Sequence, residues 1–432
     1  MYRPLLTQVC VLVVGLSIGQ IAVAETPFTT GSEFQISSSP DVQFGSRSAA
    51  DAAGNFVVVF ENATQAYYPN AFDVLGRRFA SDGSPIGSNF QVNSFTPILQ
   101  VYPNIAMRPS GEFVVVWQSL YQDGSDFGVF AQRFDSAAVP VGGEMMVNTA
   151  TADYQGNVDV AYDADGGFVV IWEHRTATLS QDDILAQRFD SVGDAVGGEV
   201  TINTTTASDQ HDPRIAARPD GSFVATWESL GQDGADEAVV VQVLASDLSP
   251  IGAEIQANVY TTSDQEDPEL AVSADGSFAV VWESQGQLAA GEEVIGRVFN
   301  SDGTPRSDEI VVPTTTALDQ ENAEVAAAED GGFVVVWRHM STVDMAYFDI
   351  LSQRLDSAGQ KVGNEFTVNE GTEGYQLYGN IASSARDRFI VSWTDDSGCC
   401  SGTGPKVEGR FVDIPLFADG FESADTTAWT IR

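Results

Sequence analysis

The fold of this protein is decided by one short stretch, GEFVVVW, at residues 111–117. Close copies of this stretch recur along the whole chain, at spacings of 55 to 57 residues between their phenylalanines. These are Phe56, Phe113, Phe168, Phe223, Phe278, Phe333 and Phe389. Such regular self-similarity indicates a repeat protein, in which each unit buries its apolar face against its neighbours.

Each repeat is expected to contain four short strands. In the second repeat they are 104–107, 112–117, 129–134 and 144–148, which are rich in β-branched and aromatic residues. Glycine-bearing turns separate them, including one predicted around Val141-Gly142-Gly143. No segment shows helical periodicity. Radial repetition of four-stranded sheets is typical of a propeller. We therefore predict an all-β fold, a seven-bladed β-propeller of four-stranded antiparallel blades, over residues 25–414.

The order of strands at the two ends of the chain predicts that the ring closes. A fourth-strand sequence, Glu33 to Ile36, precedes every other strand, whereas the last repeat ends at its third strand, Val407 to Val412. We therefore expect the N-terminal strand to complete the last blade, which would protect an edge that could otherwise pair with another chain. An open solenoid is the less favoured alternative, because it has no use for this offset.

Residues 1–24 are predicted to be a signal peptide. Arg3 is followed by a short apolar run and then by Ala22 and Ala24, small residues placed for cleavage before Glu25. The run is too short to span a bilayer, and no other segment approaches the roughly 20 apolar residues that a helix needs. We expect a secreted or cell-envelope protein, in the periplasm or on the cell surface, without a membrane span.

Composition excludes several classes of partner. The chain has 20 Lys and Arg against 61 Asp and Glu, a net charge of −41. This field repels nucleic acids and anionic lipid surfaces. Three histidines and three cysteines leave little material for transition-metal or thiol chemistry. No cofactor is expected apart from weakly bound Ca²⁺, which favours oxygen-rich loops. Solvated turn acids are the favoured alternative for the candidate ligands, which are Asp123, Asp126, Asp182, Asp183, Asp233 and Asp236.

Two positions of the repeat are invariant. An alanine stands seven residues before each repeat phenylalanine, where crowding at the ring axis would exclude larger side chains. A glutamine stands 13 residues before it, just ahead of the predicted innermost strand. The glutamines are Gln43, Gln100, Gln155, Gln210, Gln265, Gln320 and Gln376. We favour amides that tie neighbouring blades together through loop backbone, and keep a ligand-binding ring at the channel mouth as the alternative.

The loops between second and third strands, and those between blades, vary in length. Loops on a rigid scaffold are where recognition usually occurs, so this face is the predicted binding surface. Its aromatic candidates are Tyr67, Tyr68, Tyr121, Phe127, Tyr347 and Phe348. The last repeat also carries Cys399 and Cys400, for which a vicinal disulfide is favoured over free thiols or a bridge to another chain.

The FVVVW unit, followed by Gln-Asp-Gly and Gln-Arg-Phe, resembles blade-like repeats of large secreted and surface proteins of bacteria. The resemblance covers roughly residues 30 to 413 and implies no single activity. Residues 415–432 contain Asp419-Gly420-Phe421-Glu422-Ser423 and Trp429, and look like a short tail motif of exported bacterial proteins, which usually has glycine where Ala424 stands. This second resemblance implies a role of the tail in the envelope or in secretion.

These observations predict a monomeric, non-enzymatic propeller that binds a protein or glycan through its variable loop face. The alternative is a polysaccharide-directed hydrolase, which would need two loop carboxylates about 5 to 10 Å apart in a cleft. Spacing implies no nucleophile with a paired base, so a catalytic triad is not expected and no catalytic residue is assigned.

Overall fold

The computed structural model describes residues 29–63, 71–176, 181–288, 291–316, 318–340, 347–371, 374–385, 387–397 and 404–414. The predicted signal peptide, the tail at 415–432, Tyr67, Tyr68, Cys399 and Cys400 lie outside these residues. Within the described ranges every regular element is a strand. They accordingly hold no helix long and apolar enough to cross a membrane.

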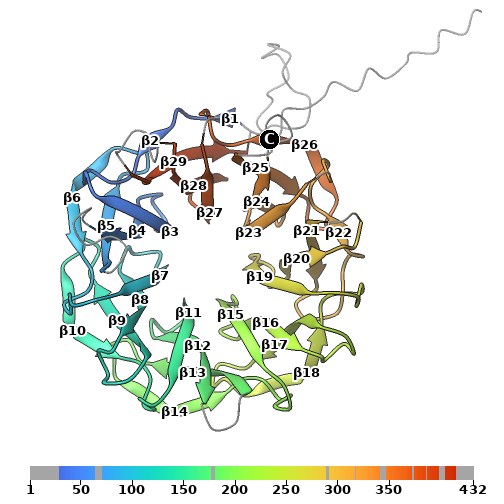
Figure 1. Cartoon of the computed structure of the whole chain (residues 1–432), viewed down its shortest axis with the longest axis horizontal. Coiled ribbons are helices and arrows are strands. Elements are labelled where there is room, and N and C mark those ends of the chain that lie inside the picture. Colours follow the sequence, from blue (N-terminus) through green and yellow to red (C-terminus); the bar gives the residue numbers. More distant parts are fainter. Residues whose placement is uncertain are drawn as a thin grey trace, which may run out of the picture.

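Seven antiparallel sheets stand around a central axis, which confirms the predicted seven-bladed propeller (Figure 1). Blade 1 is β3 (Val42–Ala50), β4 (Phe56–Ala63), β5 (Asp73–Phe79) and β6 (Pro85–Gln91); blade 2 is β7 (Gln100–Met107), β8 (Phe113–Leu120), β9 (Phe127–Phe134) and β10 (Pro140–Met146). Blade 3 is β11 (Tyr154–Tyr162), β12 (Phe168–Thr176), β13 (Gln181–Phe189) and β14 (Ala195–Thr201); blade 4 is β15 (Gln210–Ala217), β16 (Phe223–Leu230), β17 (Glu237–Leu244) and β18 (Pro250–Gln256).

The remaining blades follow the same order. Blade 5 is β19 (Gln265–Val272), β20 (Phe278–Gln285), β21 (Glu292–Phe299) and β22 (Ile310–Val311); blade 6 is β23 (Gln320–Ala327), β24 (Phe333–Met340), β25 (Phe348–Leu355) and β26 (Lys361–Thr367). Blade 7 is β27 (Gln376–Ser383), β28 (Arg388–Asp395) and β29 (Lys406–Asp413), with β1 (Thr29–Thr30) and β2 (Phe34–Gln35) outside them. The first strand of each blade is innermost and faces the axis (Figure 1).

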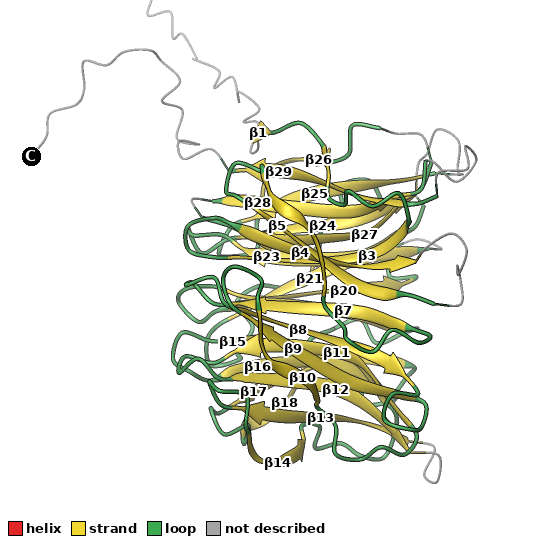
Figure 2. Ribbon diagram, turned by 90° about the vertical axis from the view of Figure 1, so that its left-hand side faces the viewer, coloured by secondary structure: helices red, strands yellow, loops and turns green. Residues whose placement is uncertain are grey.

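The side view shows loops at the two faces of the ring (Figure 2). One face carries the loops between second and third strands and the linkers between blades; we call it the mouth face. The opposite face, which we call the turn face, carries the short turns between first and second and between third and fourth strands.

The N-terminal strands close the ring as predicted. Thr29 and Thr30 pair with Asp413 and Val412, and Phe34 pairs with Gly409, all on β29. The last blade is thus completed by residues from the other end of the described chain, and its third strand has no free edge there.

The repeat aromatics form the core between blades. The tryptophan that ends each FVVVW unit is buried, as Trp117 and Trp227 show at 0% exposure. Each repeat phenylalanine stacks on the phenylalanine of the Gln-Arg-Phe unit where both are present; for Phe113 and Phe134 the ring centroids are 4.8 Å apart. Second strands are covered on both sides by other blades, which explains their continuous apolar runs.

One predicted turn is wrong. Val141-Gly142-Gly143 lies inside β10, where the pairing with β9 shifts register between Val141 and Met145. Gly142 has φ of 77°, the left-handed conformation that such a bulge requires. The turn lies earlier, where Asp135 N–H donates to the Val139 carbonyl at 3.0 Å. Glycine therefore marks a bulge at this position rather than a turn.

Candidate functional site at the channel mouth

Every innermost strand bulges near the mouth face. Its pairing with the second strand shifts register at the same place in all seven blades. The residue at the bulge, 11 positions before the repeat phenylalanine, has φ between 45° and 53°. These residues are Gly45, Tyr102, Asn157, Asp212, Asp267, Asn322 and Tyr378, which we call the mouth ring. Six of them are not glycine, and such conformations cost on the order of 1 to 3 kcal/mol each and cluster at functional sites.

The mouth ring lines one cavity of about 730 Å³. Tyr102 and Tyr378 are the most open aromatics of the ring, with 65% and 45% of their surface exposed. On the blade 4 and 5 side the wall carries Asp212 and Asp267. The opposite wall is apolar and is formed by Phe44, Phe72, Leu99, Val101 and Phe127. The volume suits a small organic ligand, and the lining offers both apolar and polar contacts.

Carboxylates hold three mouth-ring residues from the neighbouring blade; two of these carboxylates are buried and that of Glu61 is half-buried. In each case a glutamate directly after the last aromatic residue of the FVVVW unit accepts the peptide N–H of the next blade's mouth-ring residue. The pairs are Glu61 with Tyr102 (2.8 Å), Glu228 with Asp267 (2.5 Å) and Glu283 with Asn322 (2.5 Å). Burial raises the pKa of Glu61 to about 7 and that of Glu283 to about 9. The strained ring therefore depends on contacts between blades.

Three carboxylates crowd together between blades 4 and 5. Oxygens of Asp212, Glu228 and Asp267 all lie within 4.8 Å of one another. Burial, together with the charge of Asp267 and against that of Arg214, raises the pKa of Asp212 to about 6. The pKa of Glu228 is also raised well above its ordinary value, first by burial. The cluster consequently retains protons at a pH where exposed carboxyls have lost them.

A second cluster, between blades 3 and 4, is balanced by its own cations. Arg175 contacts Glu173 at 3.2 Å and Asp182 at 2.9 Å. His211 lies 3.6 Å from Glu173 and 3.5 Å from Asp182. Burial lowers the pKa of His211, but the hydrogen bond and charge of Glu173 and the charge of Asp182 outweigh it and raise the pKa to about 9. Two cations thus face two carboxylates, an arrangement that needs no metal ion.

A ring of polar side chains lies two residues deeper than the mouth ring. It consists of Arg47, Asn104, Asp159, Arg214, Glu269, Glu324 and Asn380, which we call the floor. Arg47 contacts Glu324 at 3.2 Å, and Arg214 contacts Glu269 at 2.6 Å. The floor side chains bond to one another and to nearby backbone groups. Five of them, all but Asp159 and Asn380, line the bottom of the cavity.

The predicted glutamines do not line the mouth. Each has 2% exposure or less. They belong to the innermost strands, at the first or second residue, rather than preceding them. In five blades the amide oxygen accepts the indole N–H of the blade's own tryptophan, as in Gln210 with Trp227 at 2.8 Å. In blades 2 to 6 the amide N–H donates to the incoming linker, so the glutamine joins a blade's second strand to the linker from the blade before it.

The aspartates proposed as Ca²⁺ ligands lie at the mouth face, outside the cavity lining, four of them in loops and Asp182 and Asp183 at the start of β13. Asp123, Asp183 and Asp233 accept the amide N–H of the asparagine that follows the fourth strand, at 3.3, 2.8 and 2.9 Å. Asp182 belongs to the Arg175 cluster, and Asp126 and Asp236 are exposed. In each of the three candidate pairs, at least one aspartate therefore already accepts a hydrogen bond from a protein donor.

The described aromatic candidates are scattered. Phe127 lines the cavity. Tyr347 and Phe348 contact Tyr375, with centroids 6.0 and 5.9 Å apart, and the Arg338 guanidinium lies 4.4 Å from the centre of the Phe348 ring. Tyr121 is exposed directly after β8, where its loop begins.

Sequence reasoning missed the mouth ring because its members differ from blade to blade. Invariant positions, alanine and glutamine, drew attention, and they serve the framework. One feature of the sequence could have revealed the mouth ring. When the repeats are aligned, the position two residues after the invariant glutamine varies among polar, aromatic and glycine residues.

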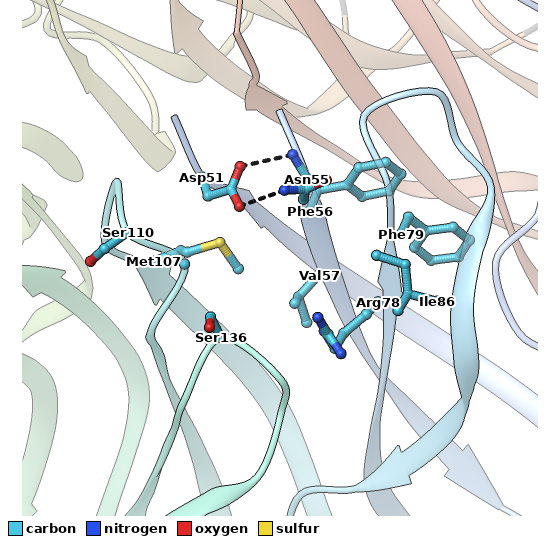
Figure 3. Close-up of a pocket in the computed structure, with 11 residues that line it drawn as sticks. Asp51, Asn55, Phe56, Val57, Arg78, Phe79, Ile86, Met107, Ser110 and Ser136 are labelled. Atoms are coloured by element: carbon cyan, nitrogen blue, oxygen red, sulfur yellow. Dashed lines mark hydrogen bonds between the residues drawn. The ribbon is translucent and has the colours of Figure 1, made fainter. Parts of the chain in front are cut away.

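A smaller cavity of about 260 Å³ lies on the turn face between blades 1 and 2 (Figure 3). Asp51 there accepts both the backbone N–H and the amide N–H of Asn55, each at 2.8 Å. Arg78 donates to the Ala137 carbonyl at 3.1 Å. Because this cavity is much smaller than the mouth cavity, at about 260 Å³ against about 730 Å³, the mouth cavity is the stronger candidate.

No family model matches the sequence, and no curated protein matches it. Solved structures match by fold. A protein of unknown function from Dyadobacter fermentans aligns with TM-score 0.55 and 7% identity, over 90% of this chain and 100% of the other. A Penicillium chrysogenum α-L-arabinanase complexed with arabinobiose gives 0.51 and 13%, over 89% and 99%. A mutant Fusarium graminearum α-L-arabinofuranosidase with an iminosugar inhibitor gives 0.51 and 12%, over 89% and 98%. At these identities the likeness shows a shared propeller fold.

Proposed function

We propose that this protein binds a glycan in the mouth cavity. The observation that carries the proposal is the lining, in which exposed tyrosines and an apolar wall stand beside carboxylates and amides in one cavity. Sugar rings have apolar C–H faces that pack on aromatic side chains, and their hydroxyls donate to carboxylates such as Asp212 and Asp267. Tyr102 and Tyr378 supply the aromatic faces.

A glycan fits this cavity better than a protein surface does. Stable protein partners cover about 800 Å² on each side, usually without a deep concavity, whereas small ligands fill concave cavities. The charge of −41 disfavours strongly anionic sugars. Two propellers of the same fold were solved with arabinobiose and with an iminosugar, which supports a saccharide as ligand.

The test is binding to an array of neutral oligosaccharides, followed by calorimetry on the hits. Tyr102→Ala and Tyr378→Ala should each weaken binding at least tenfold, because each removes an aromatic contact face. Tyr121→Ala is the matched control, since Tyr121 is also an exposed tyrosine at positive φ but lies outside the cavity. Equal affinity of all three variants, or no saccharide ligand at all, would reject the proposal.

Hydrolysis of the bound glycan is the second candidate, favoured by the Asp212–Glu228–Asp267 cluster. Retaining glycosidases use two carboxyl groups about 5 to 5.5 Å apart, one protonated and one ionised. Oxygens of Asp212 and Asp267 lie within 4.8 Å, and burial raises the pKa of Asp212 to about 6. If the site is catalytic, Asp212→Asn and Asp267→Asn should abolish product release while binding persists. If the wild-type protein binds the glycan but releases no product, hydrolysis is rejected and the protein is a glycan-binding protein.

A further inference from the structure

We propose that the mouth cavity is a blind well that receives the end of a glycan chain, rather than a passage or a groove for its interior. The inference rests on the proposed function and concerns how the ligand enters. It follows from the floor, whose side chains lie two residues below the mouth ring and bond from blade to blade.

The floor is tied together across blades. Arg47 of blade 1 reaches Glu324 of blade 6, past the whole of blade 7, at 3.2 Å. Asn380 of blade 7 also donates to Glu324, at 3.2 Å, and accepts the backbone N–H of Ser48 at 2.9 Å. Blades 6, 7 and 1 are therefore joined through one glutamate near the axis.

The other side of the floor is joined in the same way. Asn104 donates to Asp159 at 2.7 Å, linking blades 2 and 3. Asp159 also accepts the backbone N–H of Ile215 at 2.8 Å, which brings in blade 4. Arg214 then contacts Glu269 of blade 5 at 2.6 Å. All seven blades take part in these contacts.

The floor resists opening because its groups are poorly exposed. The side chains of Arg214 and Glu269 are 17% and 14% exposed, and those of Arg47 and Glu324 are 26% and 12% exposed. Moving one side chain of a floor ion pair aside would leave the charge of the other without its partner in a poorly hydrated place, which is strongly unfavourable. We therefore expect a ligand that enters from the mouth face to stop at the floor.

The depth of the well sets what can enter. Mouth ring and floor are two residues apart along each strand, roughly 7 Å at the rise of a β-strand. Seven blades enclose the space laterally (Figure 1). An interior segment of a linear glycan would need two exits, whereas a terminal sugar needs one. The terminal sugar would rest on the floor, with the rest of the chain leading out past Tyr102 and Tyr378.

The experiment compares linear and cyclic glycans of the same linkage. The probes are maltohexaose with α-cyclodextrin, and linear with cyclic β-1,2-glucan, alongside arabinobiose, an arabinohexaose and linear arabinan, all by calorimetry. We expect one protein per linear chain whatever its length, and at least tenfold weaker binding of any cyclic form. A stoichiometry that rises with chain length, or equal affinity for cyclic and linear forms, would overturn the inference and leave glycan binding intact. Failure of every probe together with the saccharide array would instead reject the proposed function.

A floor variant gives an independent readout. Arg47→Met removes the contact with Glu324 but leaves the mouth ring and the apolar wall in place. Affinity for linear oligosaccharides should fall several-fold if the terminal sugar rests on the floor. Arg78→Met, on the turn face, is the matched control and should bind as the wild type does. Unchanged affinity of a folded Arg47→Met protein, judged by its circular dichroism, would contradict floor contact.

Discussion

Trp227 donates its indole N–H to Oε1 of Gln210 at 2.8 Å, and neither side chain has any exposed surface. The Gln210 amide donates in turn to the Ser208 carbonyl at 3.1 Å, in the linker from blade 3. One amide therefore satisfies a buried indole and a linker carbonyl at once, and the glutamines of blades 2, 5 and 6 do the same.

Gln210→Ala should lower the free energy of unfolding by roughly 1 to 3 kcal/mol, because it leaves a buried indole donor and a linker carbonyl unsatisfied. Urea denaturation measures the change. Gln256→Ala is the control, since that glutamine is exposed on an outermost strand and should change stability little. Equal stability of the two variants would contradict the framework role of the glutamine.

Blade 3 offers a contrasting case. Gln155 uses its amide oxygen to accept from Asn148 at 3.0 Å, and the buried indole N–H of Trp172 has no hydrogen-bond partner. Trp172→Phe therefore removes an unsatisfied donor, whereas Trp227→Phe orphans an acceptor. We expect Trp227→Phe to be the more destabilising by about 1 to 3 kcal/mol in urea denaturation. Identical losses would show that packing volume alone sets the cost.

Stability should fall as the pH rises from about 4 to about 7, opposite to the trend for salt-bridged carboxylates. Burial, joined in three cases by neighbouring acids, raises folded pKa values to about 7 for Glu61, about 6 for Asp212, about 7 for Glu266 and about 7 for Glu408, against 3.8 to 4.5 for free carboxyls. When a carboxyl has a higher pKa in the folded protein than in the unfolded chain, it contributes stability fully below its unfolded pKa. This contribution is lost as the pH rises through its pKa in the folded protein.

Thermal melts at constant ionic strength check this. The melting temperature should be higher at pH 5 than at pH 8, and Glu61→Gln should flatten part of the dependence because it removes one of the titrating groups. Gln256→Ala, which changes an exposed side chain without a titratable group, should leave the profile unchanged. A melting temperature that increases between these two pH values would refute the prediction.

Removing residues 29–36 should destabilise the last blade and leave β29 with an unpaired edge. We expect a lower melting temperature and concentration-dependent association, measured by light scattering during heating. The milder Phe34→Ala keeps the backbone pairing but removes the ring that lies 5.7 Å from Phe411, and should lower only the melting temperature. A truncated protein that melts like the full chain would argue against a stabilising closure.

The sequence determined the architecture because the repeat supplied seven independent readings of one pattern. Phe113 and its counterparts set the blades, and Glu33 to Ile36 set the closure. The mouth ring could not be predicted in the same way. A tyrosine at position 102 or 378 does not predict a left-handed backbone. That conformation is imposed by the bulge and, at Tyr102, by Glu61 of the neighbouring blade. The floor likewise depends on contacts between residues hundreds of positions apart, such as Arg47 with Glu324.

The pairing of Thr29 and Thr30 with β29 also determines when the ring can close. The two partners come from opposite ends of the described chain, so the strand that is made first pairs with the strand that is made last. Until both are present, a partly folded ring has a gap bordered by unpaired backbone. Only the full-length product can seal it, and a chain that stops before Lys406 keeps the gap permanently. The seam thus distinguishes finished molecules from truncated ones, which remain open to chaperones and proteases.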